Sequence, residues 1–374
     1  MKILSVFGTR PESIKMAPLI KCLEKNRSVT SIVCNTSQHK DMIEPILRFF
    51  DIKSDYDLDI MRPNQTLSEI TTNVITGLMP ILQKEKPDWV LVQGDTTTTA
   101  AAALTSFYAK INIGHVEAGL RTGNNYAPFP EEINRKITSL LANLHFTPTN
   151  IGKENLLKEG INKSQIFVTG NTVVDSLYLA LDKLQTDSQS NKCRETLSNL
   201  GLQLDKEIIL VTGHRRENIG SNLADICLGL KKISNAYPDI NIVYPVHMNP
   251  NVRNQVLKIL GTVKGIHLIN PLDYPTFIWL MNRSKIILTD SGGIQEEAPS
   301  LGIPVLVMRN ETERQESIDL GVSRLIGTDP DNIFEQTKLL LNDNTVKNSV
   351  LKISNPYGDG TASIRILKIL LEMN

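Results

Sequence analysis

The stretch that decides the fold is WVLVQGDTTTTAAAALTSFYAKINIGHVEAG, residues 89–119. It begins with a continuous apolar run, passes through a glycine, an aspartate and four threonines into a helix-like segment, and returns to a second apolar run ending on Glu117. Continuous apolar runs of this length are typical of parallel strands that are buried on both faces of a sheet. A strand, a helix and another strand in this order predict a βαβ unit.

The same alternation recurs along the whole chain of 374 residues. A chain of this length predicts two or three domains. The segment 184–206 is polar and without strand character, so we place the domain boundary near residues 170–206. We expect an α/β protein of two Rossmann-like, doubly wound domains. The N-terminal domain covers 1–170, the C-terminal domain covers 171–360, and a last helix over 361–374 packs back on the first domain.

Composition and charge exclude several classes of protein. Forty Lys and Arg residues balance forty Asp and Glu residues, which argues against a nucleic-acid partner held by bulk electrostatics. The cysteines are scattered without a CxxC pair, so neither a zinc site nor a disulfide framework is predicted. No apolar stretch reaches the ~18 residues of a membrane span, and the opening MKILSVFG is typical of a first strand. We expect a cytoplasmic protein without a metal or a membrane partner.

Polar side chains follow the predicted strands at the points where they end. In open α/β sheets, ligands bind outside the carboxyl ends of the strands. Two such edges that face each other predict a ligand cleft between the domains. The residues at these strand ends are Arg10, Asp95 and Glu117 in the first half, and His214, His247, Asp290 and Ser291 in the second.

A structural interpretation stays open beside the functional one for several of these groups. Asp95 precedes a run of threonines and could be the N-cap of a helix. Glu131 and Arg135 are four residues apart after Pro130, so they could be only an ion pair on a helix surface. The remaining histidines, His39, His115, His145 and His267, have the sequence context of ordinary packing or surface residues.

Two glycine-containing stretches are candidate anion sites. In FGTRPESIKMAPL, a helix start is flanked by Arg10 and Lys15. In TDSGGIQEEAPSLG, Ser291–Gly293 allows close backbone approach to a phosphate, and a carboxylate of Glu296 or Glu297 could bind a ribose diol. Neither stretch is GxGxxG or GxxxxGK[ST], so neither NAD nor a P-loop nucleotidase is supported. Together they predict a diphosphate ligand.

These segments, with GDTTTT, GHVEAGLRTG, PFPEEINR, TGNTVVDSL, GHRREN, YPVHMNPNVR and NPYGDG, resemble the non-hydrolysing UDP-N-acetylglucosamine 2-epimerases over nearly the whole chain. The resemblance implies a GT-B-like fold, a homodimer, and no metal or nicotinamide cofactor. It implies reversible epimerisation of UDP-GlcNAc to UDP-ManNAc by elimination and re-addition of UDP through 2-acetamidoglucal, for bacterial surface polysaccharides. A hydrolysing epimerase releasing ManNAc and UDP, or a GT-B glycosyltransferase, is the alternative.

The resemblance also implies roles for individual residues. Asp95, Glu117, Glu131 and His214 fall on catalytic positions, although which carboxylate is base and which is acid stays open. The substrate-binding positions, besides Asp95, Glu117 and His214, are Arg10, Lys15, Arg135, Phe277, Ser291, Gly292, Gly293, Glu297 and Arg314. The chain departs from the family pattern at several positions. Gln93 stands where histidine is usual, Ala127 where serine is common, and Leu272 where some relatives have glutamine, and RNETERQES replaces a pattern more like RDTTERPEA but keeps Arg314.

A second UDP-GlcNAc activates many bacterial members of this family. The resemblance places that allosteric site at Gln38, Asp41, Asn64, Arg215 and His247. Asp41 adds a carboxylate where the family has glutamine, and Asn64 stands where the family has an arginine. Both changes weaken a diphosphate site, by repulsion and by loss of a charge-assisted bond of roughly 1.5–3 kcal/mol. We expect a reduced need for the activator; the alternative is that both positions are tolerant surface.

Overall fold

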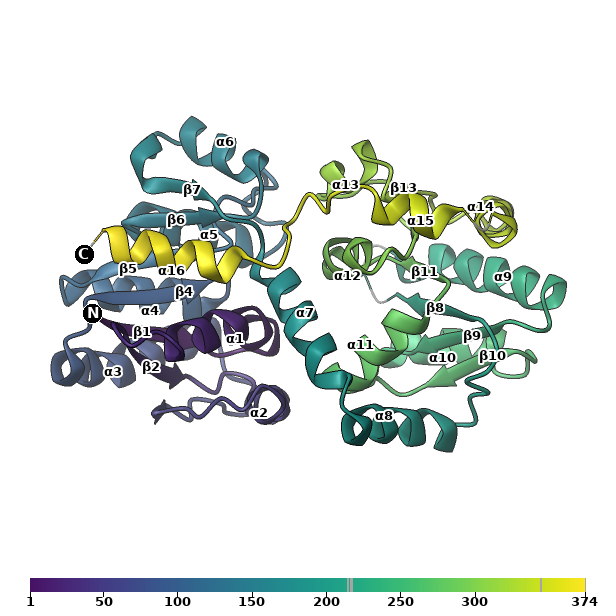
Figure 1. Cartoon of the computed structure of the whole chain (residues 1–374), viewed down its shortest axis with the longest axis horizontal. Helices are drawn as coiled ribbons and strands as arrows, with labels where there is room; N and C mark the ends of the chain where they lie inside the picture. Colours follow the sequence, from purple (N-terminus) through teal and green to yellow (C-terminus); the bar gives the residue numbers. More distant parts are fainter. Residues whose placement is uncertain (214, 216–217, 344, 374) are drawn as a thin grey trace. The chain divides into compact units, whose positions relative to one another are not determined.

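The computed structural model describes residues 1–213, 215, 218–343 and 345–373, and they form two compact units (Figure 1). Unit 1 comprises Met1–Leu179 and Tyr357–Asn374, and unit 2 comprises Ala180–Pro356. The chain therefore enters unit 2 after Leu179 and returns to unit 1 at Tyr357, whereas the sequence-based boundaries lie after residues 170 and 360.

Unit 1 contains a seven-stranded parallel sheet in the order β3-β2-β1-β4-β5-β6-β7. Its strands are β1 (Lys2–Phe7), β2 (Thr30–Asn35), β3 (Tyr56–Asp57), β4 (Trp89–Gln93), β5 (Asn112–Val116), β6 (Leu144–Thr147) and β7 (Ile166–Val168). The central strands are apolar on both sides and buried, because helices cover both faces of the sheet.

The helices of unit 1 connect these strands. They are α1 (Arg10–Glu24), α2 (Lys40–Phe49), α3 (Leu67–Glu85), α4 (Thr97–Tyr108), α5 (Glu131–Leu141), α6 (Asn150–Lys158), the short η1 (Lys163–Gln165), the connecting helix α7 (Thr172–Leu184) and the last helix α16 (Ala362–Glu372). Helix α16 packs on α1, so the end of the chain completes the N-terminal unit (Figure 1).

Unit 2 contains a six-stranded parallel sheet in the order β10-β9-β8-β11-β12-β13. Its strands are β8 (Ile208–Thr212), β9 (Asn241–Pro245), β10 (Ile266–Ile269), β11 (Ile286–Thr289), β12 (Val305–Val307) and β13 (Ser323–Leu325). Its helices are α8 (Asp187–Asn199), α9 (Ser221–Ala236), α10 (Pro250–Leu260), α11 (Tyr274–Arg283), α12 (Gly292–Glu297), η3 (Ala298–Leu301), α13 (Gln315–Asp319), α14 (Pro330–Asn342) and α15 (Val346–Leu351).

Both sheets have the strand order of Rossmann-type doubly wound sheets, so the prediction of two such domains is confirmed. In each sheet the order reverses between two adjacent strands, β1 and β4 in unit 1 and β8 and β11 in unit 2. Helices leave such a pair toward opposite faces, which opens a crevice above the strand ends. Arg10 and Asp95 follow β1 and β4, so topology alone brings their segments together.

None of the helices among the described residues combines the length and the apolar character that crossing a bilayer requires.

Two buried histidines give unit 1 a specific pH dependence of stability. His115 on β5 and His145 on β6 are adjacent in register and fully buried. Burial lowers the pKa of His115 from 6.5 to about 3 and that of His145 from 6.5 to about 4. The unfolded chain binds these protons at higher pH than the folded chain does. These groups therefore cost no stability above about pH 6.5, and stability falls as the pH drops below it.

We predict that replacing His145 with glutamine, which cannot take up a proton, reduces the loss of thermal stability between pH 7 and pH 5. At pH 5 each neutral buried histidine costs about 2 kcal/mol relative to the protonated unfolded state. The measurement is the difference in Tm between the two pH values for the parent and for His145→Gln. Equal differences in the two proteins would contradict the assignment.

Candidate active site

The carboxylate of Glu117 lies directly after β5 and is surrounded by hydrogen-bond donors. The Lys15 ammonium on α1 donates to Oε1 and Oε2, each at 2.6 Å. The amide of Gln93, the last residue of β4, donates to Oε2, and the Asn171 amide donates to Oε1 at 3.2 Å. The Glu117 side chain is only 4% exposed. Because these partners all donate, they stabilise the ionised carboxylate.

The backbone of Glu117 is itself unusual. Its φ is 62°, in the left-handed region that residues other than glycine seldom adopt. Such a conformation costs of order 1–3 kcal/mol and persists only where the surrounding structure imposes it. The conformation turns the chain sharply at the strand end, and the donors around the side chain hold it there. Strain of this kind at a strand end is typical of a functional position.

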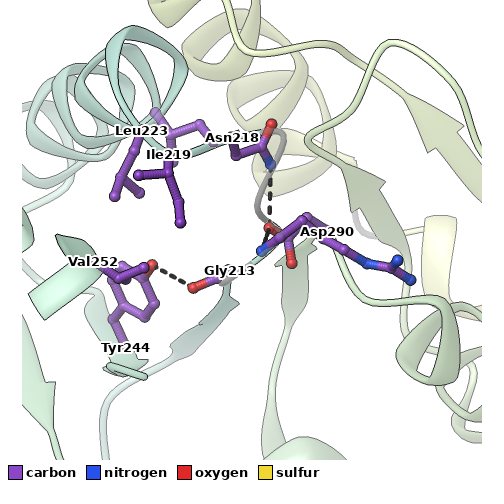
Figure 2. A pocket seen from close by; sticks show the side chains of 9 residues that line it. Gly213, Asn218, Ile219, Leu223, Tyr244, Val252 and Asp290 are labelled. Atoms are coloured by element: carbon purple, nitrogen blue, oxygen red, sulfur yellow. Dashed lines mark hydrogen bonds between the residues drawn. The ribbon is translucent and has the colours of Figure 1, made fainter. Parts of the chain in front are cut away.

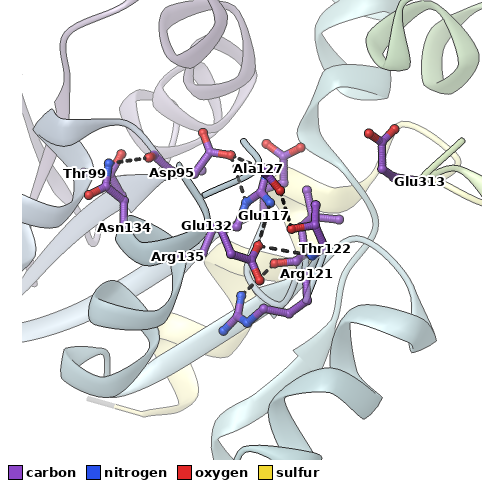
Figure 3. Close-up of polar contacts among 12 residues, drawn as sticks. Asp95, Thr99, Glu117, Arg121, Thr122, Ala127, Glu132, Asn134, Arg135 and Glu313 are labelled. Carbon is purple, nitrogen blue, oxygen red and sulfur yellow. Dashed lines mark hydrogen bonds and ion pairs between the residues drawn. The ribbon is translucent and has the colours of Figure 1, made fainter. Parts of the chain in front are cut away.

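A second carboxylate, Asp95, lies after β4 and is held by Arg135 of α5 (Figure 3). Arg135 Nε and Nη2 both donate to Asp95 Oδ2, at 2.9 and 2.7 Å. Its third nitrogen, Nη1, donates to Glu132 Oε2 at 3.1 Å. Glu132 is fully buried and also accepts the backbone N–H groups of Thr122 and Gly123. One guanidinium therefore joins Asp95, α5 and the loop before it.

This geometry decides two of the interpretations that the sequence left open. Thr96, not Asp95, is the N-cap of α4, because its hydroxyl accepts the backbone N–H of Thr99. Arg135 pairs with Asp95 and Glu132, so the surface ion pair between Arg135 and Glu131 is not the arrangement observed. Oε2 of Glu131 is buried and has no hydrogen-bond partner among the described residues.

Glu12 of α1 links the turn after β1 to the turn after β4. Its Oε2 accepts the backbone N–H groups of Gly8 and Thr9, at 3.1 and 2.8 Å. Its Oε1 accepts the hydroxyls of Thr96 and Thr99, at 2.7 and 2.9 Å. Burial raises the pKa of Glu12, and these donors oppose that shift. Glu12 therefore fixes the start of α1, which carries Arg10 and Lys15, relative to the turn that carries Asp95.

In unit 2 a buried frame holds the chain on both sides of position 214. The Tyr244 hydroxyl donates to the Gly213 carbonyl at 2.9 Å (Figure 2). The fully buried Asp290 accepts the backbone N–H of Arg215 at 2.9 Å and the Asn218 amide at 3.1 Å. His214, predicted to be catalytic, lies outside the described residues. The frame fixes its described neighbours, Gly213 and Arg215, at the β8–β11 crevice.

The predicted uridine diphosphate segment lies at the start of α12. The guanidinium of Arg314 binds Glu296 Oε1 through Nε at 2.9 Å and Nη2 at 2.8 Å. A side chain at position 292 would place its Cβ 2.9 Å from the Arg314 Cζ, so the guanidinium would have to shift if this residue were not glycine. Ser291 is the residue before α12, Gly293 and Glu297 lie within it, and Phe277 lies half-buried on α11.

Three of the residues predicted for the activator site line one hollow in unit 1. Gln38, Asp41 and Asn64 surround a volume of about 660 Å³ together with Arg62 and Met42. Arg62 donates to the backbone carbonyls of Asp59 and Met61. The other two predicted residues, Arg215 and His247, belong to unit 2. His247 is exposed, and its Nδ1 accepts the backbone N–H of Asn249.

Several residues of this network were not singled out from the sequence. Glu12, Glu132 and Asn171 lie inside motifs that were recognised, but no role was assigned to them. Gln93 was noted only as a departure from the family pattern. The spacing of Glu132 and Arg135, three residues apart in FPEEINR, was the one local signal available.

Comparisons with known proteins agree with this fold. The family model described as UDP-N-acetylglucosamine 2-epimerase matches residues 21–371. The UDP-N-acetylglucosamine 2-epimerase of Escherichia coli K12 is 53% identical over 372 residues, 99% of this chain and 98% of its own. The crystal structure of the Neisseria meningitidis UDP-GlcNAc 2-epimerase bound to UDP-GlcNAc is 49% identical, with a TM-score of 0.91 and full coverage of both chains. The Methanocaldococcus jannaschii enzyme in complex with UDP-GlcNAc and UDP is 34% identical, with a TM-score of 0.81 and full coverage of both chains.

The fold and its relatives define an isomerase of the GT-B-like class. The chain belongs to the UDP-N-acetylglucosamine 2-epimerase family. The family predicted from the sequence motifs is therefore confirmed, and the glycosyltransferase alternative is not supported.

We predict that Arg135→Lys lowers epimerase kcat by about 10- to 100-fold. A lysine keeps the charge but cannot hold Asp95 and Glu132 together through a planar fork. One lost charge-assisted bond of about 1.5–3 kcal/mol corresponds to this range. The measurement is steady-state conversion of UDP-GlcNAc.

The matched control for Arg135→Lys is Lys136→Met. Lys136 is the next residue of α5 and bonds only Asn125 among the described residues. Its replacement should leave kcat unchanged. An Arg135→Lys enzyme with the parent's kcat would show that the guanidinium fork does not matter for turnover.

Proposed function

We propose that this enzyme interconverts UDP-GlcNAc and UDP-ManNAc reversibly by eliminating UDP and adding it back. The observation that carries the proposal is the pair of carboxylates, Glu117 and Asp95, which lie at one edge of one sheet and are bonded to Lys15 and Arg135, respectively. The family assignment supports the substrate. No residue pattern in the chain indicates a nicotinamide site that would serve an oxidative route.

The chemistry follows from the low acidity of the C2 proton. In the elimination, a carboxylate takes the proton from C2, the C1–oxygen bond breaks, and its electron pair leaves with UDP. The product is 2-acetamidoglucal. In the return step the UDP oxygen attacks C1, and an acid delivers a proton to C2 on the opposite face. No oxidant or reductant is consumed, and the UDP released in the elimination is the group that attacks C1 in the return step.

We assign the two C2 groups to Asp95 and Glu117, with either order of base and acid open. Glu131 is the third acid. Its buried Oε2 has no hydrogen-bond partner among the described residues, so we propose that it bonds a group of the substrate. In unit 2 we assign the uridine diphosphate to Phe277, Ser291–Gly293, Glu297 and Arg314. Arg10, Lys15 and His214 are proposed to stabilise the leaving diphosphate.

We predict that epimerisation in D2O places one deuteron at C2 of the product. The proton removed from C2 passes to a carboxylate that exchanges with solvent before the return step. Mass spectrometry and proton NMR of UDP-GlcNAc incubated with the enzyme alone give the answer. An epimerised product with protium at C2 contradicts elimination and re-addition, and release of free ManNAc with UDP would identify a hydrolysing epimerase.

We also propose that the need for UDP-GlcNAc as an activator is reduced. Asp41 and Asn64 line the hollow in unit 1, where a carboxylate and a neutral amide replace groups that favour a diphosphate. Starting from pure UDP-ManNAc, we predict prompt conversion without a lag. Absence of conversion until UDP-GlcNAc is added would contradict this. The double variant Asp41→Gln, Asn64→Arg should increase the effect of added UDP-GlcNAc.

The cellular setting is likewise a proposal. We propose a cytoplasmic homodimer that supplies UDP-ManNAc for surface polysaccharide synthesis. Exposed apolar side chains on the neighbouring helices α4 and α5, namely Phe107, Tyr108, Ile137 and Leu140, support a protein interface there. Light scattering on the purified enzyme tests the dimer.

A further inference from the structure

Two motifs that have no role in the mechanism meet in unit 1. They are TGNTVVDSL, residues 169–177, and the first part of the return segment, Tyr357–Gly358. The backbone N–H of Asn171 donates to the Tyr357 carbonyl at 2.6 Å. Gly170 and Gly358 lie so close that a Cβ on Gly170 would be 3.2 Å from the Gly358 Cα. The two passages of the chain between the units are therefore joined at this point, which we call the crossover joint.

Further bonds hold the crossover joint without the Asn171 side chain. The carboxylate of Asp175 accepts the backbone N–H groups of Ala362 and Ser363, at 3.2 and 2.7 Å, at the start of α16. Arg365 Nη1 donates to the Thr169 carbonyl at 3.0 Å. Burial raises the pKa of Asp175, and the two N–H donors oppose that shift. These contacts explain why the return segment stays attached to unit 1.

The orientation of the Asn171 side chain follows from the bonds that it makes with Val173 and Glu117. The backbone N–H of Val173 donates to Oδ1 at 3.1 Å, so the oxygen of the amide faces α7. The nitrogen, Nδ2, then faces Glu117 Oε1 at 3.2 Å. The residue is 1% exposed, so water does not replace either bond. Asn171 thus joins the crossover joint to the carboxylate of Glu117 by a single amide.

We propose that Asn171 is a positioning residue that sets the orientation of Glu117 for proton transfer. The donors to this carboxylate include Lys15 from α1, Gln93 from β4 and Asn171 from the crossover joint. Lys15 is also assigned to the substrate diphosphate, and an ammonium drawn toward a diphosphate holds the carboxylate less firmly. The two neutral amides then fix a side chain whose backbone is strained. The inference rests on the proposed function, because it concerns the proton transferred at C2.

The test compares Asn171→Asp and Asn171→Ser with the control Asp175→Asn. Asn171→Asp keeps the shape and the acceptor for Val173 but puts a second carboxylate against Glu117. Asn171→Ser keeps a small acceptor near Val173 and lacks the amide that donates to Glu117. Asp175→Asn weakens the crossover joint without touching Glu117. For each variant, kcat, KM, the pH profile of kcat and Tm are measured with UDP-GlcNAc.

We expect Asn171→Asp to lower kcat at neutral pH by at least ~10-fold, with KM within about twofold of the parent. The acidic limb of its pH profile should move to higher pH, because a like charge favours the protonated form of Glu117. Lys15 is the charged side chain bonded to Glu117 among the described residues, and it is present in parent and variant alike. Asn171→Ser should lower kcat less and leave KM similar. Asp175→Asn should lower Tm and leave kcat and the pH profile unchanged.

Three outcomes overturn the inference. The first is a folded Asn171→Asp enzyme with the parent's kcat and pH profile. If Asn171→Asp does not fold, an Asn171→Ser enzyme with the parent's kcat overturns the inference instead. Another is an equal loss of kcat in Asp175→Asn, which would assign the effect to the joint as a whole. The last is a parent that does not convert UDP-GlcNAc, which overturns the proposed function and the role of Asn171 with it.

Discussion

Buried carboxylates at the carboxyl edge of the first sheet are the constraint on which unit 1 depends. A carboxylate removed from water is tolerated only when donors surround it. Glu12, Glu117 and Glu132 are all buried, and each accepts several hydrogen bonds. Their donors come from different strands, helices and turns. Each bond that offsets the desolvation of a carboxylate therefore also fixes one segment relative to another.

The same sheet topology places the candidate functional groups in both units. The order of strands reverses between β1 and β4 in unit 1 and between β8 and β11 in unit 2. In unit 1 this reversal brings Arg10 and Asp95 to one crevice. In unit 2 it brings Arg215 against Asp290, which accepts the Arg215 backbone N–H. At these strand ends unit 1 has the carboxylates of Asp95 and Glu117, whereas unit 2 has Asp290 and the glycine-containing start of α12 with Arg314 beside it.

Local backbone conformation refines this arrangement. Glu117 occupies the left-handed region, and its side chain is bonded to Lys15. Gly292 has no side chain where the Arg314 guanidinium approaches, so the pair of Arg314 and Glu296 can form against the start of α12. Lys15 at Glu117 and Arg314 at Gly292 both come from another segment of the chain. The residue type that suits each position therefore depends on a contact that is distant in sequence.

Much of this protein is determined by the sequence alone. Apolar runs alternating with helix-like segments predict two doubly wound domains, because strand and helix periodicities are local properties of the chain. The polar residues at the strand ends predict the functional edge, because parallel strands all end on the same side of their sheet. Asp95 and Glu117 could be selected in this way before any contact was known.

Only the tertiary structure decided the partners of these residues. Asp95 pairs with an arginine 40 residues away, Glu117 with a lysine 102 residues away and with an asparagine 54 residues away. Nothing in the local sequence distinguishes Arg135 bonded to Asp95 from Arg135 bonded to Glu131, because both acids lie within reach of one long side chain. The choice depends on where α5 lies against the end of β4, and that placement is a property of the packed sheet and its helices.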